Sequence, residues 1–93
     1  MKAFKVERTI TNEEKMQHYN KLKEKYGILL LFRCGDWYEA YAEDAQVVAD
    51  ELNIVVTKQD GFQLAAFPHM ALDCYLPRLI RAGHRIAICD FTD

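Results

Sequence analysis

The spacing of apolar residues changes several times along the chain, and the first clear pattern is helical. Between residues 12 and 26, apolar side chains recur at steps of three and four, which predicts an amphipathic helix. Thr11 and Glu14 have the spacing of a capping box at its start, in which each side chain pairs with a free backbone amide. Gly27 follows the last periodic residue and is typical of a helix end.

Two further stretches show the same helical spacing. Residues 43–52 place apolar side chains on one face, and Glu43 and Asp44 fall in the first turn, where the helix dipole favours negative charge. Residues 70–82 form the last predicted helix. Pro77 lies inside it and removes a backbone hydrogen bond, so we expect this helix to bend or to start irregularly.

Shorter apolar runs between the helices predict β-strands. Residues 28–32 are all apolar, as is typical of a strand that is buried on both faces. The other predicted strands cover residues 37–41, 54–58, 62–67 and 85–89. Asp60 and Gly61 lie between two of these strands and form a strong hairpin signal.

The order of the predicted elements defines the fold class. Helix, strand, strand, helix, strand, strand, helix, strand indicates an α/β (more narrowly α+β) fold, a mixed β-sheet flanked by about three helices. Four aliphatic residues of the first and last strands are expected to form the core of central strands: Leu30, Leu31, Ile86 and Ile88. The 93 residues suffice for one domain, placed at residues 11–93 after an N-terminal segment, residues 1–10, that is expected to be flexible.

Composition supports a globular domain, with 51% apolar and 12% aromatic residues. No apolar stretch approaches the roughly 18 residues that a membrane span needs, and the first ten residues lack the apolar run of a signal peptide. The three cysteines show no C-x-x-C spacing and sit among apolar residues, so we expect buried, inert thiols: Cys34, Cys74 and Cys89. These features predict a cytoplasmic domain without membrane contact.

The net charge of −2 is unevenly distributed. Residues 1–25 sum to +3, residues 26–60 to −5 and residues 61–93 to zero. Lysines on the first predicted helix are interpreted as a solvated face: Lys15, Lys21, Lys23 and Lys25. Because phosphate neutralisation supplies most of the affinity of DNA-binding proteins, this balance predicts weak autonomous binding to DNA.

The sequence lacks the motifs of several enzyme classes. It contains no phosphate-binding G-x-x-x-x-G-K-[ST] loop and no G-x-G-x-x-G. The three histidines show no metal-ligand spacing, and no nucleophile–base pair is visible. We therefore expect no cofactor, no metal, no ATPase activity and no other enzymatic activity.

Several segments form a series that is unusual in order and spacing. They are residues 32–39 (FRCGDWYE), 43–45 (EDA), 52–58 (LNIVVTK), 68–71 (PHMA), 75–79 (YLPRL) and 82–89 (AGHRIAIC). Together they resemble the N-terminal mismatch-recognition domain, domain I, of the MutS family of DNA mismatch-repair proteins. The resemblance is collinear from about Met16 to Asp90.

This resemblance implies a mixed sheet with flanking helices that approaches the minor groove of DNA. In the family, an aromatic residue of the segment matching residues 32–39 stacks on the mispaired base, and a glutamate two residues later hydrogen-bonds to that base. By position, Trp37 matches this wedge and Glu39 matches the polar reader. Three further residues are candidate contacts to the DNA backbone or to the loop: Arg33, Lys58 and His69. Of these, Arg33 is expected chiefly to shape the turn.

Departures from the family pattern keep a second interpretation open. Trp37 stands where the family usually has Phe, and an aromatic after a glycine turn can instead be a core residue. Gln59 replaces a basic residue, and the sequence ends where the other MutS domains would begin. The leading prediction is a stand-alone module that binds mismatched or distorted DNA. The alternative is a non-catalytic module that binds a protein partner, without mismatch readout.

Overall fold

The computed structural model describes residues 10–91, so most of the predicted flexible segment, residues 1–9, lies outside the described residues. The elements are α1 (Asn12–Tyr26), β1 (Leu29–Cys34), β2 (Trp37–Tyr41), α2 (Ala42–Leu52), β3 (Val56–Gln59), β4 (Phe62–Pro68), a 3-10 turn η1 (His69–Ala71), α3 (Leu72–Arg81) and β5 (Ile86–Asp90). The predicted order of helices and strands is confirmed. No helix within the described residues is long and apolar enough to cross a membrane.

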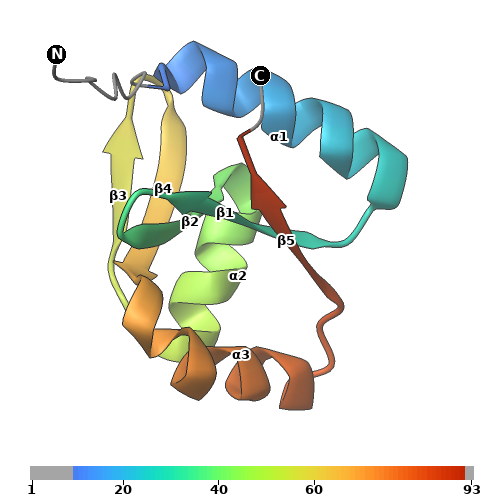
Figure 1. Cartoon of the computed structure of the whole chain (residues 1–93), viewed down its shortest axis with the longest axis vertical. Coiled ribbons are helices and arrows are strands. Elements are labelled where there is room, and N and C mark those ends of the chain that lie inside the picture. The colour runs from blue at the N-terminus through green and yellow to red at the C-terminus, as the bar shows by residue number, and fades with distance from the viewer. Residues whose placement is uncertain (1–9, 92–93) are drawn as a thin grey trace, which may run out of the picture.

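The strands form one five-stranded sheet in the order β3-β4-β2-β1-β5 (Figure 1). Neighbouring strands are antiparallel except β1 and β5, which are parallel, so the sheet is mixed as predicted. The β3–β4 hairpin turns at Asp60 and Gly61, both with positive φ (44° and 86°). This is the backbone of a type I′ turn, which explains why Asp-Gly predicted the hairpin correctly.

The helix ends follow their local signals. At the start of α1 the capping box is present, since the Thr11 hydroxyl accepts from the Glu14 amide while the Glu14 side chain accepts from the Thr11 amide. The helix ends at Gly27 in the left-handed conformation, with φ 65°. The last helix starts irregularly, as expected, because the 3-10 turn η1 precedes α3. Pro77 lies within α3.

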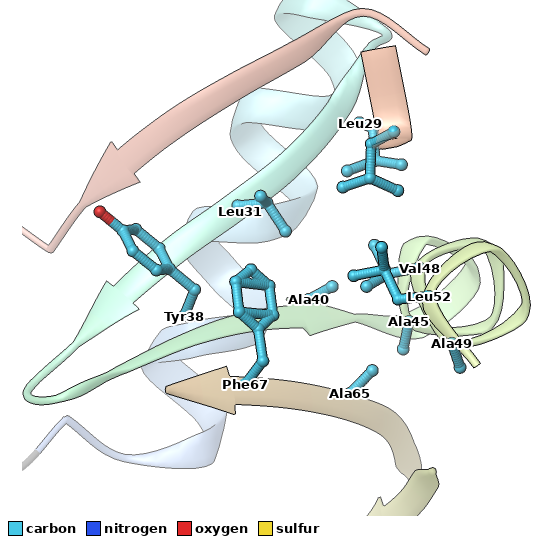
Figure 2. Packing of buried hydrophobic residues seen from close by; sticks show 11 residues of the cluster. Leu29, Leu31, Tyr38, Ala40, Ala45, Val48, Ala49, Leu52, Ala65 and Phe67 are labelled. Atoms are coloured by element: carbon cyan, nitrogen blue, oxygen red, sulfur yellow. The ribbon is translucent and has the colours of Figure 1, made fainter. Parts of the chain in front are cut away.

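Helices cover both faces of the sheet. On one face, α2 and α3 pack on alternate residues of the strands, among them Leu29, Leu31 and Ala40 (Figure 2). On the other face, α1 contributes Tyr19 to a second cluster of buried residues: Leu30, Phe32, Tyr41, Phe62 and Leu64. The consecutive residues of β1 therefore point into two different apolar layers, which is why its sequence is continuously apolar.

The prediction for the last strand was partly wrong. Leu30 and Leu31 are fully buried, but Ile86 is only half-buried and Ile88 is 46% exposed. The reason is topological, because among the strands of residues 10–91 β5 pairs with β1 alone and forms an edge of the sheet. A strand that was expected to be central is therefore peripheral.

One charged side chain is buried in the core region. Asp44, in the first turn of α2, is only 4% exposed. Its Oδ2 accepts from the backbone amide of Leu30 at 3.1 Å, and its Oδ1 accepts from Lys23 Nζ at 2.9 Å. Asp44 therefore ties α2 to β1 and α1, which goes beyond the dipole role expected from its position in the sequence.

Candidate nucleic-acid interface

The candidate site is built on the hairpin that joins β1 to β2. Cys34 and Trp37 are paired across it, which leaves Gly35 and Asp36 as a two-residue turn. Gly35 has φ 59°, a value that favours glycine, at the first central position of the turn. Arg33 Nε donates to the Gly35 carbonyl at 2.5 Å, which agrees with the expectation that Arg33 shapes the turn.

Trp37 is the first residue of β2 and lies directly after this turn. Its Cα partners are Cys34 on β1 and Pro68 on β4. The side chain is 49% exposed, although large aromatic residues are usually well covered by the protein. Trp37 is therefore not a core residue, and much of its ring can be reached from solvent.

Glu39 shares a face of the sheet with Trp37, because residues two apart on a strand point the same way. Unlike Trp37, its side chain is largely covered, with 13% exposed. Glu39 Oε1 accepts from Lys15 Nζ at 2.9 Å and from Tyr41 Oη at 2.7 Å. The carboxylate is thus anchored by a lysine of α1 and a tyrosine of its own strand, two residues along β2 from the exposed Trp37.

Tyr41 connects this carboxylate to a thiol. The Tyr41 side chain is fully buried, and its hydroxyl lies 3.4 Å from Cys34 Sγ. Burial raises the pKa of the Tyr41 hydroxyl, which therefore stays protonated. The hydroxyl donates a hydrogen bond to Glu39. Burial also raises the pKa of the Cys34 thiol, to about 11, and the charge of Glu39 adds to this effect.

These surroundings predict which cysteine reacts first. None of the three cysteines is fully buried, against our expectation, because Cys34 and Cys89 are half-buried and Cys74 is exposed. Burial raises the pKa of the Cys34 and Cys89 thiols, which disfavours their reactive thiolate form. With limiting iodoacetamide at pH 8, we expect mass spectrometry to find Cys74 modified first. The Cys74→Ser variant should lose this rapid phase, and a rapid phase that persists in it would contradict the prediction.

His69 lies beside the hairpin turn. Its backbone amide donates to the Asp36 carbonyl at 2.8 Å, so the start of η1 is fixed against the turn. The neighbouring Pro68 is exposed, and Met70 is 79% exposed. The end of β4 therefore adds a histidine and exposed apolar groups to the same end of the sheet as Trp37.

Lys58 lies elsewhere. It pairs with Gln63 on β4, whereas Trp37 pairs with Pro68, five residues further along that strand. At about 3.3 Å per residue, this places the two positions roughly 16 Å apart along the sheet, with β4 between their strands. The fold thus places Arg33, Trp37, Glu39 and His69 near one end of the sheet and leaves Lys58 at a distance. Arg33 pairs with Tyr38 and therefore lies on the opposite face from Trp37.

Sequence reasoning missed two members of the site, Lys15 and Tyr41. The alternation along β2 could have placed Tyr41 on the face of Glu39. Lys15 gave no comparable signal, because its contact depends on where α1 crosses the sheet. No group of three His, Cys, Asp or Glu residues that could hold a metal occurs within the described part of the chain.

Fold and site together describe a small α+β domain that presents an exposed aromatic ring next to an anchored carboxylate at a hairpin turn. Residues 13–93 match the family model described as MutS domain I. The match covers most of the sequence, so the chain belongs to the MutS domain I family, and the resemblance expected from the sequence is confirmed.

Individual relatives agree with this membership. The chain is similar to proteins named DNA mismatch repair protein MutS from Christiangramia forsetii (51% identical over 80 residues), Thermotoga neapolitana (50% over 76) and Cytophaga hutchinsonii (52% over 81). Each match covers 81% of this chain but only 9%, 10% and 10% of the respective relative. The chain therefore spans about a tenth of the length of the relatives it matches.

Proposed function

We propose that this domain binds mismatched or distorted duplex DNA, with Trp37 as an aromatic wedge and Glu39 as the group that contacts the displaced base. The observation that carries the proposal is the exposure of Trp37 two residues before the anchored carboxylate of Glu39, on the same face of the sheet. Membership in the MutS domain I family and the names of the relatives support it. Arg33 and His69, near the hairpin turn, remain candidate contacts to the DNA backbone in this proposal, whereas Lys58 would need a second area of contact.

The physics of stacking favours this role. Apolar side chains that enter the minor groove partly unstack a base step and kink the duplex. A mispaired base costs less to unstack than a paired one, which gives the wedge its selectivity. Stacking on an aromatic ring contributes about 1–3 kcal/mol per base, so the wedge can supply a preference but not tight binding.

Charge limits the affinity of the isolated domain. Residues 26–60, which include the hairpin, sum to −5. We therefore expect dissociation constants in the range of non-specific complexes, roughly 10⁻⁴–10⁻⁶ M. The proposed role is recognition, and we expect no ATP hydrolysis by these 93 residues, which contain no phosphate-binding loop. A domain with this role would work in the cytoplasm of a bacterial cell.

A protein-interaction role is the alternative function. The observation that favours it is that β5 forms an edge of the sheet within the described part of the chain, with Ile88 46% exposed. Edge strands present unpaired backbone groups that can accept a strand from another protein. In this case the domain would bind a protein partner and would not distinguish mismatched from matched DNA.

The Trp37→Ala variant separates the two functions. We expect it to abolish the preference for a duplex with a single mismatch over the matched duplex, because stacking is lost. Salt-dependent background binding should remain nearly unchanged, since the substitution removes no charge. Fluorescence anisotropy with both duplexes, titrated at several salt concentrations, measures the two effects.

Two control variants make the result specific. Trp37→Phe keeps an aromatic ring and should keep the preference. Tyr26→Ala removes a similarly exposed aromatic residue (52%), the last residue of α1, which is not part of the candidate site. This variant should leave the preference intact. A Trp37→Ala domain that still prefers the mismatch would overturn the wedge and favour the protein-interaction role.

A further inference from the structure

The ion pair between Lys15 and Glu39 links α1 to β2 across 24 positions in sequence. Exposed ion pairs contribute little, because water and salt screen them. This pair is better shielded, since its side chains are only 14% and 13% exposed and Nζ lies 2.9 Å from Oε1. Such a pair holds its partners in one geometry more firmly than a surface pair does.

Tyr41 completes the arrangement around Glu39. Its hydroxyl donates to the same Oε1 at 2.7 Å, and Lys15 Nζ lies 5.9 Å from the centre of its ring. The ring itself is fixed, stacked on Phe32 at 5.1 Å and edge-on to Phe62 at 5.8 Å. Two donors, one of them rigidly packed, therefore hold one oxygen of the carboxylate in place.

These two donors to Glu39 bind the same oxygen of its carboxylate. Among the described residues, the N–H donor of Lys15 and the O–H donor of Tyr41 both end at Oε1, and the Cys34 thiol makes a further side-chain contact with the carboxylate. An ionised carboxylate is only an acceptor, so Oε2 can pair with an N–H group. Bases carry such groups on the edges that normal pairing occupies and a mispair exposes. Lys15 also balances the charge of Glu39, which would otherwise repel the phosphates.

We propose that Lys15 is a positioning residue that sets mismatch specificity. It acts through Glu39, by fixing Oε1 and leaving Oε2 to accept an N–H from the mispaired base. The inference rests on the proposed function, because it presumes that Glu39 faces DNA. It adds a residue of α1, Lys15, to the recognition site.

The test compares two lysines of α1. Lys15→Met removes the donor and the charge but keeps the aliphatic stem, and Lys21→Met makes the same change at an exposed position. We expect Lys15→Met to lower the ratio of matched to mismatched dissociation constants by about fivefold, the factor for one net hydrogen bond. Lys21→Met should leave this ratio unchanged, although each variant removes one positive charge from α1. Lys15→Arg keeps a donor and a charge and should retain most of the preference.

A double-variant cycle shows whether Lys15 acts through Glu39. In a Glu39→Ala background, Lys15→Met should have no further effect on the ratio. An equal loss in both backgrounds would mean that Lys15 contacts DNA directly, and would overturn the inference. The inference would also be overturned if Trp37→Ala abolishes the mismatch preference while Lys15→Met keeps the wild-type ratio of dissociation constants. A wild-type domain without any mismatch preference would overturn the proposed function itself, and this inference with it. Urea unfolding of each variant separates these effects from misfolding.

Discussion

Replacing Leu30 by alanine is expected to lower the free energy of unfolding by about 2–5 kcal/mol, the range for a buried leucine. Leu30 is fully buried in β1, which has a strand on each side, and its side chain packs in the layer beneath α1. A small domain has only about 5–15 kcal/mol in total, so the loss would be a large part of its stability. Equilibrium unfolding in urea, followed by far-UV circular dichroism, gives the shift of the midpoint.

Ile88 provides the matched control for this experiment. It lies on the neighbouring strand, with Leu31 as its partner in the register, but it is 46% exposed at the sheet edge. Because part of the side chain is already in water, Ile88→Ala should cost less than about 1.5 kcal/mol. Equal losses for Leu30→Ala and Ile88→Ala would contradict the assignment of β5 as an uncovered edge.

The contrast between these two residues shows how far periodicity could predict the fold. Residues 28–32 and 86–89 are similarly apolar, and both were correctly predicted as strands. Their positions in the sheet differ because strand order depends on long-range pairing, which no local pattern encodes. Element types and boundaries, fixed by caps and turns such as Asp60-Gly61, were therefore more predictable than burial.

The candidate site was predictable to a similar degree. The resemblance placed Trp37 and Glu39 by position, and their common face followed from strand alternation. The exposure of Trp37 was not predictable, because the apolar pattern fits a core aromatic equally well. Lys15 remained hidden among the lysines of the first helix, since only the packing of α1 on the sheet brings it 2.9 Å from Glu39.

Asp44 shows the same limitation in the core. The pairing of β1 with β2 runs from the hairpin turn as far as the pair Phe32–Glu39. Shortly after, the chain leaves β2 and enters α2 at Ala42, which has φ 55°. Beyond the end of this ladder, the buried amide of Leu30 donates to the Asp44 carboxylate. A side chain thus replaces a strand partner, because a buried amide must find an acceptor.

Replacing Asp44 by alanine should therefore destabilise the domain by about 2–3 kcal/mol, the cost of losing a charge-assisted hydrogen bond and leaving a buried amide unpaired. Lys23 adds little to this loss, since it keeps its hydrogen bond to the Ile28 carbonyl and is partly exposed. Asp50→Ala removes an exposed carboxylate of the same helix. This carboxylate accepts a hydrogen bond from Gln46, and its loss should change the stability by less than about 0.5 kcal/mol. Urea unfolding measures both variants, and hydrogen exchange of the Leu30 amide reports directly on the lost bond. If Asp44→Ala were as stable as Asp50→Ala, with the Leu30 amide still protected, Asp44 would not be the group that completes the β1 ladder.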